Sequence, residues 1–370
     1  MNRARIVALL CLAACGGGRP PPKPLEHISL PAGNLLDPYD VSRPGEARPL
    51  YTAQVGGVVY ASLSNLNPNT FAPAGPGFLA GIDPISGSVG LINLGGADRH
   101  QCVNPGVIRQ DSQKMYAACA GDFSGTVGGG QAVVEVDLAR GALARALAAP
   151  PGVVPSGVAV TATKIWFGDS ATPQLLSVNR ATFTLADGAG EHPAISMPCP
   201  STGKFPFVPY VGIVGGDLYA LCATTEAGVL ARFDAQTGTA KGSVSVGAQP
   251  TQFAATGDGR IAVVNSNDNT LTLVTPGATL SAQVALTFKS PTATLQDVKA
   301  RDQFVFTVAS GSNTVQKIDL TAADGPKVVA EANTGMSSNP FNLEPLDDDT
   351  VVVVNWATSD VVAPKLTTVQ

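Results

Sequence analysis

The chain has 370 residues, of which 14% are charged, and a formal net charge of −5 at pH 7. This mildly acidic balance argues against nucleic acid and against an anionic membrane surface as partners. The 40 glycines and 29 prolines make up about a fifth of the chain, which suits a fold with many turns and falls short of disorder. Outside the N-terminus no amphipathic helical pattern exceeds two turns. The sequence therefore favours an all-β fold.

Residues 1–14 have the pattern of a signal peptide. Arg3 and Arg5 supply positive charge, and the apolar run that follows them is too short to span a bilayer. Leu12-Ala13-Ala14-Cys15 then resembles the bacterial lipobox, in which the thiol of the cysteine becomes the lipid attachment point. The resemblance implies lipidation at Cys15. An ordinary secretory signal with a chance cysteine, or a short membrane anchor, are the alternatives.

Residues 15–25 are rich in glycine and proline and are interpreted as a tether. No aspartate follows Cys15, which in lipoproteins is associated with sorting to the outer membrane. Removing Arg3 and Arg5 with the signal would leave 21 basic and 28 acidic residues, a net charge of −7. We therefore expect an outer-membrane lipoprotein of the bacterial cell envelope, with its periplasmic or surface side left open.

Residues 26–370 contain a repeated unit that is clearest from Pro250 to Leu286. There TQFAAT, IAVVN, TLTLV and SAQVAL are short apolar or alternating runs separated by turns rich in Gly, Asn, Asp and Pro. Runs joined so tightly predict a four-stranded antiparallel meander. One such sheet cannot bury both faces alone, so the copies must stack on one another.

A proline opens each of seven copies. The prolines are Pro49, Pro105, Pro155, Pro209, Pro250, Pro291 and Pro340. This periodicity resembles the blades of a β-propeller of the YVTN and lactonase-like seven-bladed group, over about residues 26–370. The WD-repeat signature is absent. The resemblance implies a single propeller domain of seven four-stranded antiparallel blades, with six or eight blades as alternatives.

The last copy, from Pro340 to Gln370, has no room for a fourth strand. A strand-like segment from His27 to Gly33 precedes the first copy and has no place in it. We expect this segment to pair as the outer strand of the last blade and so to close the ring.

Four cysteines remain after Cys11 and Cys15 are set aside; three disulfide pairings of them are possible, and four buried free thiols are the alternative. The repeat places Cys102 before the innermost strand of the second blade and Cys119 in the neighbouring strand. Cys199 and Cys222 have the same relation in the fourth blade. The register therefore favours the disulfides Cys102–Cys119 and Cys199–Cys222.

In propellers the loops between blades and those between second and third strands share one rim. The insertions of this chain fall on such loops: Leu63 to Gly77, Gly95 to Asn104, Gly121 to Gln131, and Met197 to Val208. We expect this rim to be the binding face, with neutral variation of loops as the alternative. The candidate binding residues on it are Arg99, His100, Asp122 and Lys204, for which plain solvated loop positions are the simpler interpretation.

Signals for catalysis are weak. His27, His100 and His192 lie far apart, so we expect no metal site and no cofactor. Trp166 and Trp356 are expected to fill space between blades. The sequence therefore predicts a monomeric, non-catalytic binding or scaffold protein for an envelope protein, peptide or glycan, held to the membrane by its N-terminal lipid. A lactonase-like or other metal-assisted hydrolase is the alternative.

Overall fold

The computed structural model describes residues 25–33, 36, 45–122, 129–186, 194–290 and 293–369. The predicted signal peptide, Cys15 and the tether up to residue 24 lie outside the described residues, as does His192. The described residues contain no helix with the length and the apolar run that a membrane crossing requires.

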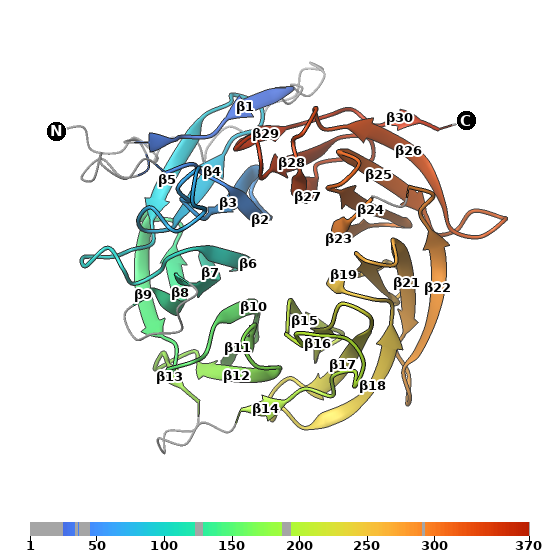
Figure 1. Cartoon of the computed structure of the whole chain (residues 1–370), viewed down its shortest axis with the longest axis horizontal. Helices are drawn as coiled ribbons and strands as arrows, with labels where there is room; N and C mark the ends of the chain where they lie inside the picture. Colours follow the sequence, from blue (N-terminus) through green and yellow to red (C-terminus); the bar gives the residue numbers. More distant parts are fainter. Residues whose placement is uncertain are drawn as a thin grey trace, which may run out of the picture.

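Seven sheets stand around a common axis, and each is a blade with its first strand nearest the centre (Figure 1). Blade one contains β2 (Pro49–Val55), β3 (Val58–Leu63), β4 (Phe78–Ile82) and β5 (Val89–Asn93). Blade two contains β6 (Pro105–Asp111), β7 (Lys114–Ala120), β8 (Gln131–Asp137) and β9 (Ala142–Ala148). Blade three contains β10 (Pro155–Val160), β11 (Lys164–Asp169) and β12 (Gln174–Asn179), and its outer edge is shared by β13 (Thr184–Leu185) and β14 (Ile195–Ser196).

The remaining blades follow the same order. Blade four contains β15 (Val211–Val214), β16 (Asp217–Ala223), β17 (Gly228–Asp234) and β18 (Ala240–Val246). Blade five contains β19 (Pro250–Ala255), β20 (Ile261–Asn265), β21 (Thr270–Thr275) and β22 (Ser281–Thr287). Blade six contains β23 (Leu295–Arg301), β24 (Phe304–Ala309), β25 (Thr314–Asp319) and β26 (Lys327–Asn333). Blade seven contains β27 (Pro340–Pro345), β28 (Val351–Asn355) and β29 (Asp360–Val362). The chain is thus the seven-bladed β-propeller that the repeat predicted.

The second strands are apolar on both faces because each blade packs between two others. In β20 every residue is buried. Val263 lies in a core cluster with Leu230 of blade four, whereas Val264 lies in a cluster with Leu295 and Val298 of blade six. Successive residues of a strand point to opposite faces, so one short apolar run serves two interfaces.

The residue that precedes the first strand is left-handed in five blades. Arg48, Asn104, Gln249, Thr294 and Asn339 have φ between 45° and 51°. Their carbonyl oxygens accept hydrogen bonds from the end of the second strand, as from Ala120 N to Asn104 O at 3.0 Å. This turn leads the chain from the outer strand of one blade to the innermost strand of the next.

The predicted opening prolines hold for most blades. Pro49, Pro105, Pro155, Pro250 and Pro340 each begin an innermost strand. In blade four, β15 begins two residues after Pro209 instead. In blade six, β23 begins at Leu295, and Pro291 lies outside the described residues.

Ring closure follows the expected route. β1 (His27–Ser29) pairs with β29 in the sheet order β1-β29-β28-β27, with Ile28 opposite Val361. Ile28 is buried against the cores of blades seven and one, and His27 Nε2 lies 2.8 Å from Asp360 Oδ2. The N-terminal strand therefore completes the last blade.

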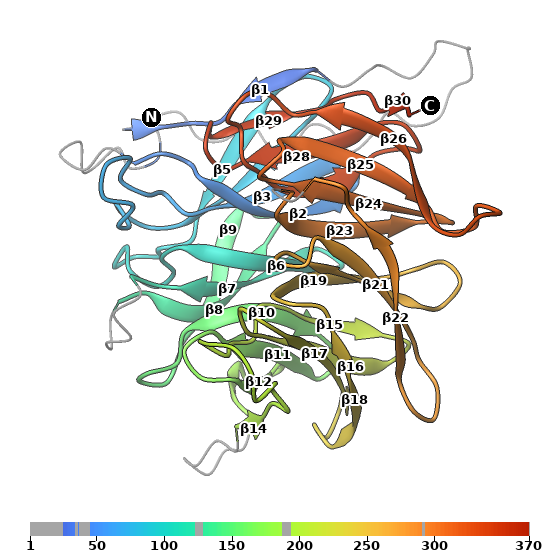
Figure 2. The same cartoon turned by 45° about the vertical axis from the view of Figure 1, so that its right-hand side comes forward.

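The C-terminus makes a second connection that the sequence did not predict. β30 (Thr367–Thr368) pairs with β26, the outer strand of blade six. On the way, Leu366 N donates to Asp349 O at 2.9 Å. Both ends of the described chain therefore fasten blades six and seven from outside, as the two views show (Figures 1 and 2).

Candidate functional site

The long loops of blades one and two form one braced surface. Gly77 N donates to Cys102 O at 3.0 Å, which joins the β3–β4 loop to the connection between blades one and two. Val103 N donates to Gly130 O at 3.1 Å, and Gly121 N donates to Val103 O at 2.9 Å, which joins that connection to the β7–β8 loop. We call this edge of the propeller, together with the Met197–Val208 segment, the loop-rich rim.

Two disulfides attach the loop-rich rim to the second strands of blades two and four. Cys102 is bonded to Cys119 and Cys199 to Cys222, which are the pairs that the repeat register favoured. Both cysteines of the first bridge are fully buried, and so is Cys222. Each bridge ties the connection that leads into a blade to the second strand of that blade, so this connection cannot move independently of the blade.

The predicted rim residues lie on this surface but do not all meet. His100 is exposed, and its backbone N–H donates to Asp98 Oδ1 at 2.9 Å. Arg99 is half-buried on the same loop, and Asp122 on the next loop accepts a hydrogen bond from Gln131 Nε2 at 3.3 Å. Lys204 is exposed on the loop of blade four, two blades away. Arg99 and His100 thus lie on the connection between blades one and two, Asp122 lies on the β7–β8 loop of blade two, and Lys204 lies on the connection between blades three and four.

Aromatic side chains add an apolar element to the rim. Phe71 and Trp356 stack with ring centroids 5.7 Å apart, across the contact between blades one and seven. The Arg48 guanidinium lies 4.6 Å from the Trp356 ring centroid and donates to the Ala357 carbonyl oxygen at 2.8 Å. Trp166, by contrast, is buried between blades, as expected, with its Nε1–H donated to Ala235 O at 2.8 Å.

Three large apolar side chains project from this rim. Phe71 is 50% exposed, Phe205 79% and Met336 92%. Phe71 and Phe205 both have left-handed backbones, with φ of 56° and 55°. Bulky residues rarely adopt this conformation, and Phe205 buries little surface that would compensate. Exposed aromatic and Met side chains are typical of protein interaction surfaces.

A second group of residues converges at the centre of the ring. Four of the innermost strands carry a polar residue two positions after their first residue; they are Tyr51, Gln252, Asp297 and Asn342. The same position is Val107 in blade two and Gly157 in blade three. The cluster is completed by Arg109, Tyr210, Lys299 and Glu344, and we call these eight residues the central cluster.

A chain of hydrogen bonds crosses the central cluster between blades. Thr52 N donates to Asn342 Oδ1 at 3.0 Å, and Asn342 Nδ2 donates to Gln252 Oε1 at 3.3 Å. All three side chains are at most 1% exposed. Among the described residues, the Gln252 Nε2 atom is buried and has no hydrogen-bond acceptor.

Asp297 is the buried acid of the cluster. It is 0% exposed, and its carboxylate accepts from Val298 N at 2.7 Å and from Leu343 N at 2.9 Å. Burial raises the pKa of Asp297 to about 6, although Lys299 and the two N–H donors oppose the shift. Asp297 therefore changes charge near pH 6.

Lys299 and Glu344 form an ion pair beside Asp297. Their Nζ and Oε1 atoms are 2.9 Å apart, and both side chains retain some contact with solvent. Burial disfavours the charge on Lys299, but the attraction of Glu344 and Asp297 outweighs it and raises the pKa of Lys299. Lys299 therefore stays protonated at any physiological pH.

Arg109 and two tyrosines face the same space. The Arg109 guanidinium lies 4.6 Å from the Tyr210 ring centroid. Burial, with Tyr210 and Asp297 nearby, raises the pKa of Tyr51, so its hydroxyl remains protonated. The ring of Tyr51 is held edge-on by Phe341 at 5.8 Å. The cluster thus carries two cations, two carboxylates and two hydroxyls.

Sequence reasoning missed the central cluster. Its members lie on different blades, about one repeat apart, and no local motif links them. The signal that could have found them is the register itself: aligning the copies on their opening residue shows polar side chains at one position of several blades and apolar or small ones elsewhere. A position on the innermost strand that is polar in some copies and apolar or small in others indicates a shared interior site.

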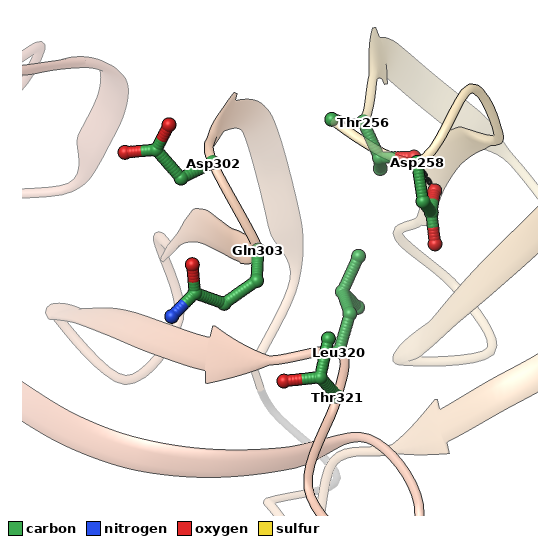
Figure 3. Close-up of a pocket in the computed structure, with 7 residues that line it drawn as sticks. Thr256, Asp258, Asp302, Gln303, Leu320 and Thr321 are labelled. Carbon is green, nitrogen blue, oxygen red and sulfur yellow. Dashed lines mark hydrogen bonds between the residues drawn. The ribbon is translucent and has the colours of Figure 1, made fainter.

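Two hollows lie on the opposite rim, among the turns that join first to second strands and third to fourth strands. One, of about 340 Å³, is lined by Thr256, Gly257, Asp258, Asp302, Gln303, Leu320 and Thr321. Figure 3 shows the Asp302 and Gln303 side chains turned away from Asp258 rather than toward it. Among the described residues, no group of three His, Cys, Asp or Glu side chains could hold a metal ion. The acidic turn at Asp348 and Asp349 pairs with Arg301 and Lys317.

Comparison with known proteins finds the fold and no closer relationship. No family model and no curated protein matches the sequence. The structure is similar to streptogramin B lyase (TM-score 0.65, 13% identity, covering 93% of this chain and 97% of that one). It is similar to a putative 6-phosphogluconolactonase of Bacteroides fragilis (TM-score 0.64, 13% identity, 86% and 95% covered). It is also similar to a chain of the mitotic checkpoint complex (TM-score 0.65, 8% identity, 96% and 100% covered). At such identities the likeness establishes the propeller fold alone.

Proposed function

We propose that this protein is a non-catalytic binding or scaffold propeller that holds an envelope protein, peptide or glycan on its loop-rich rim. The observation that carries the proposal is the bracing of the rim loops by hydrogen bonds in series and by two disulfides. A surface that is ordered in advance loses little conformational entropy when a partner binds. The chain of the mitotic checkpoint complex shows that this fold can serve in a protein assembly.

The proposed lipid anchor suits this arrangement. Leu25 N donates to Pro84 O at 2.7 Å, in the turn between β4 and β5 on the opposite rim. A tether that ends there would leave the loop-rich rim directed away from the membrane. Cys15→Ala, followed by palmitate labelling and membrane fractionation, tests the anchor. We expect labelling and membrane association to be lost, and continued labelling would end the lipoprotein proposal.

Capture from an envelope extract tests the binding function. The bait is the soluble form that begins at Leu25, and the variant is Phe205→Ser. Phe205 is 79% exposed, so its loss should weaken capture without changing the melting temperature. Val284→Ser, on the outer edge strand β22 and 57% exposed, is the matched control. Equal capture by wild type and F205S would contradict a role for this rim.

Metal-assisted hydrolysis is the alternative function. It draws support from the fold that the chain shares with a putative lactonase. Metal analysis of the purified protein separates the two functions. Stoichiometric calcium or zinc would favour the hydrolase over the binding protein.

A further inference from the structure

We propose that the central cluster is a binding site for a small organic acid, whose carboxylate is held by Arg109, Tyr51 and Gln252. This site is separate from the loop-rich rim. Its residues belong to the innermost strands β2, β6, β19, β23 and β27 and to the position just before β15, and these strands surround the centre of the ring (Figure 1).

The orientation of the Gln252 amide is the first argument. Asn342 Oδ1 accepts from Thr52 N, which fixes the Asn342 amide and makes its Nδ2 a donor to Gln252 Oε1. Reversing Gln252 would set two NH₂ groups against each other. Gln252 Nε2 is therefore a buried donor, and it lacks an acceptor within the described part of the chain. A buried donor that is left unpaired destabilises the protein, so an acceptor supplied by a ligand would be favoured.

Arg109 is the second argument. Its Nη1 donates to the Ile108 carbonyl oxygen at 3.0 Å, and its guanidinium lies against the Tyr210 ring. No carboxylate among the described residues forms an ion pair with it, in contrast to Lys299, which pairs with Glu344. A half-buried guanidinium that is free to make two parallel hydrogen bonds matches the geometry of a carboxylate.

The balance of donors and acceptors gives the ligand class. Within the described residues, the hydroxyls of Tyr51 and Tyr210 form no hydrogen bond, whereas both Asp297 oxygens already accept backbone N–H groups. The polar groups of the cluster that have no partner in the protein are thus mainly hydrogen-bond donors. A ligand that is rich in hydrogen-bond acceptors would match them. With both carboxylates ionised, Asp297 and Glu344 balance the charges of Arg109 and Lys299, so the cluster has no surplus positive charge to hold a multiply charged anion.

The experiment uses trifluoroacetate as the probe and follows its ¹⁹F resonance with the full soluble protein. We expect saturable line broadening that acetate reverses and sulfate at equal ionic strength reverses less well. Arg109→Gln should weaken binding about tenfold or more, because a charged hydrogen-bond partner is lost. Tyr51→Phe keeps the ring against Phe341 and should fold normally, yet bind more weakly.

Arg140→Gln is the matched control, because the Arg140 side chain is 84% exposed on the opposite rim. It should bind as wild type does. No saturable broadening with wild type, or equal binding by wild type, R109Q and Y51F, would overturn the site. Displacement by sulfate more readily than by acetate would overturn the assignment to a carboxylate. Rim capture by F205S is measured separately, so the two proposals can fail independently.

Discussion

At the residue scale, Asp297 and Gly157 occupy the same position of the repeat but have different structural roles. Both are the third residue of an innermost strand. In blade six the position holds a buried acid that bridges to the backbone of blade seven. In blade three it is a glycine, because the backbone of blade four lies against it.

We predict that Gly157→Ala destabilises the protein strongly. A Cβ at this position would lie 2.6 Å from Val211 N and 2.9 Å from the Tyr210 Cα, and backbone atoms cannot give way as a side chain can. Overpacking of this kind costs about 1 to 3 kcal/mol. Gly106→Ala in blade two is the control, since its Cβ would meet nothing closer than 3.6 Å. Chemical denaturation measures both, and equal stability of the two variants would refute the close approach.

We predict that Asp297 makes the protein less stable as the pH rises from about 4 to about 6. Burial raises the pKa of Asp297 to about 6 in the folded state, above the value of an exposed aspartate, so the folded protein binds this proton more tightly than the unfolded chain does. The stabilisation is full below the unfolded pKa and is lost as the pH passes through the folded one, by about 2 to 3 kcal/mol in total.

Asp297→Asn should remove that dependence. The difference in unfolding free energy between wild type and variant should therefore shift in favour of the variant between pH 4 and pH 7. Other acids act at lower pH: burial opposes the ionisation of Asp217, but hydrogen bonds from Lys241 and Arg232 outweigh it and lower its pKa. A difference that stays constant from pH 4 to pH 7 would show that Asp297 is not titrating there.

At the element scale, the two chain ends add strands to blades six and seven, and the disulfides fasten the long loops of blades two and four. β1 supplies the outer strand that blade seven cannot make, and β30 adds a strand to blade six. The disulfides stabilise blades two and four in another way, because each one fastens a long loop to the second strand of its blade.

Deleting residues 26–33 should lower the melting temperature substantially. The deletion removes β1, its pairing with β29 and the buried Ile28 and Leu30 side chains, and it opens the seam between blades seven and one. The form that begins at Leu25 is the control, because it keeps the whole strand. Thermal unfolding followed by circular dichroism is the measurement, and an unchanged midpoint would mean that the ring closes without β1.

Each disulfide should contribute about 3 kcal/mol in the chain-entropy model, since the loops span 17 and 23 residues. Replacing both Cys102 and Cys119 by alanine, with Cys199–Cys222 left intact, measures the first contribution by denaturant unfolding. Non-reducing peptide mapping provides the check on pairing. Another pairing in the wild type would show that the repeat register is wrong.

The sequence was sufficient for the architecture because the repeat is local. Alternating strands, turn residues and opening prolines are each readable within one copy, and the missing fourth strand of blade seven follows from counting residues. The C-terminal strand β30 was not readable, because two residues in a strand leave no pattern. The central cluster was not readable either, because its chemistry arises only when residues of different blades meet at the axis.

At the scale of the whole molecule, the propeller presents two separate surfaces. The loop-rich rim carries exposed aromatic side chains on braced loops, and the axis carries the buried Asp297 beside the partly buried Lys299–Glu344 ion pair. The opposite rim is made of short turns and receives the N-terminal segment at Pro84. A ring of seven blades keeps these surfaces at fixed positions, which suits a protein that holds a partner rather than one that closes around a substrate.

Photo-crosslinking in cells tests the central claim most directly. A benzophenone side chain is placed at Phe71 or Phe205 on the loop-rich rim, or at Ile85, which is 45% exposed on the opposite rim. A partner held by the loop-rich rim predicts the same crosslinked species from positions 71 and 205 and none from position 85. A crosslinked species from position 85 alone, or none from either rim position, would contradict the account.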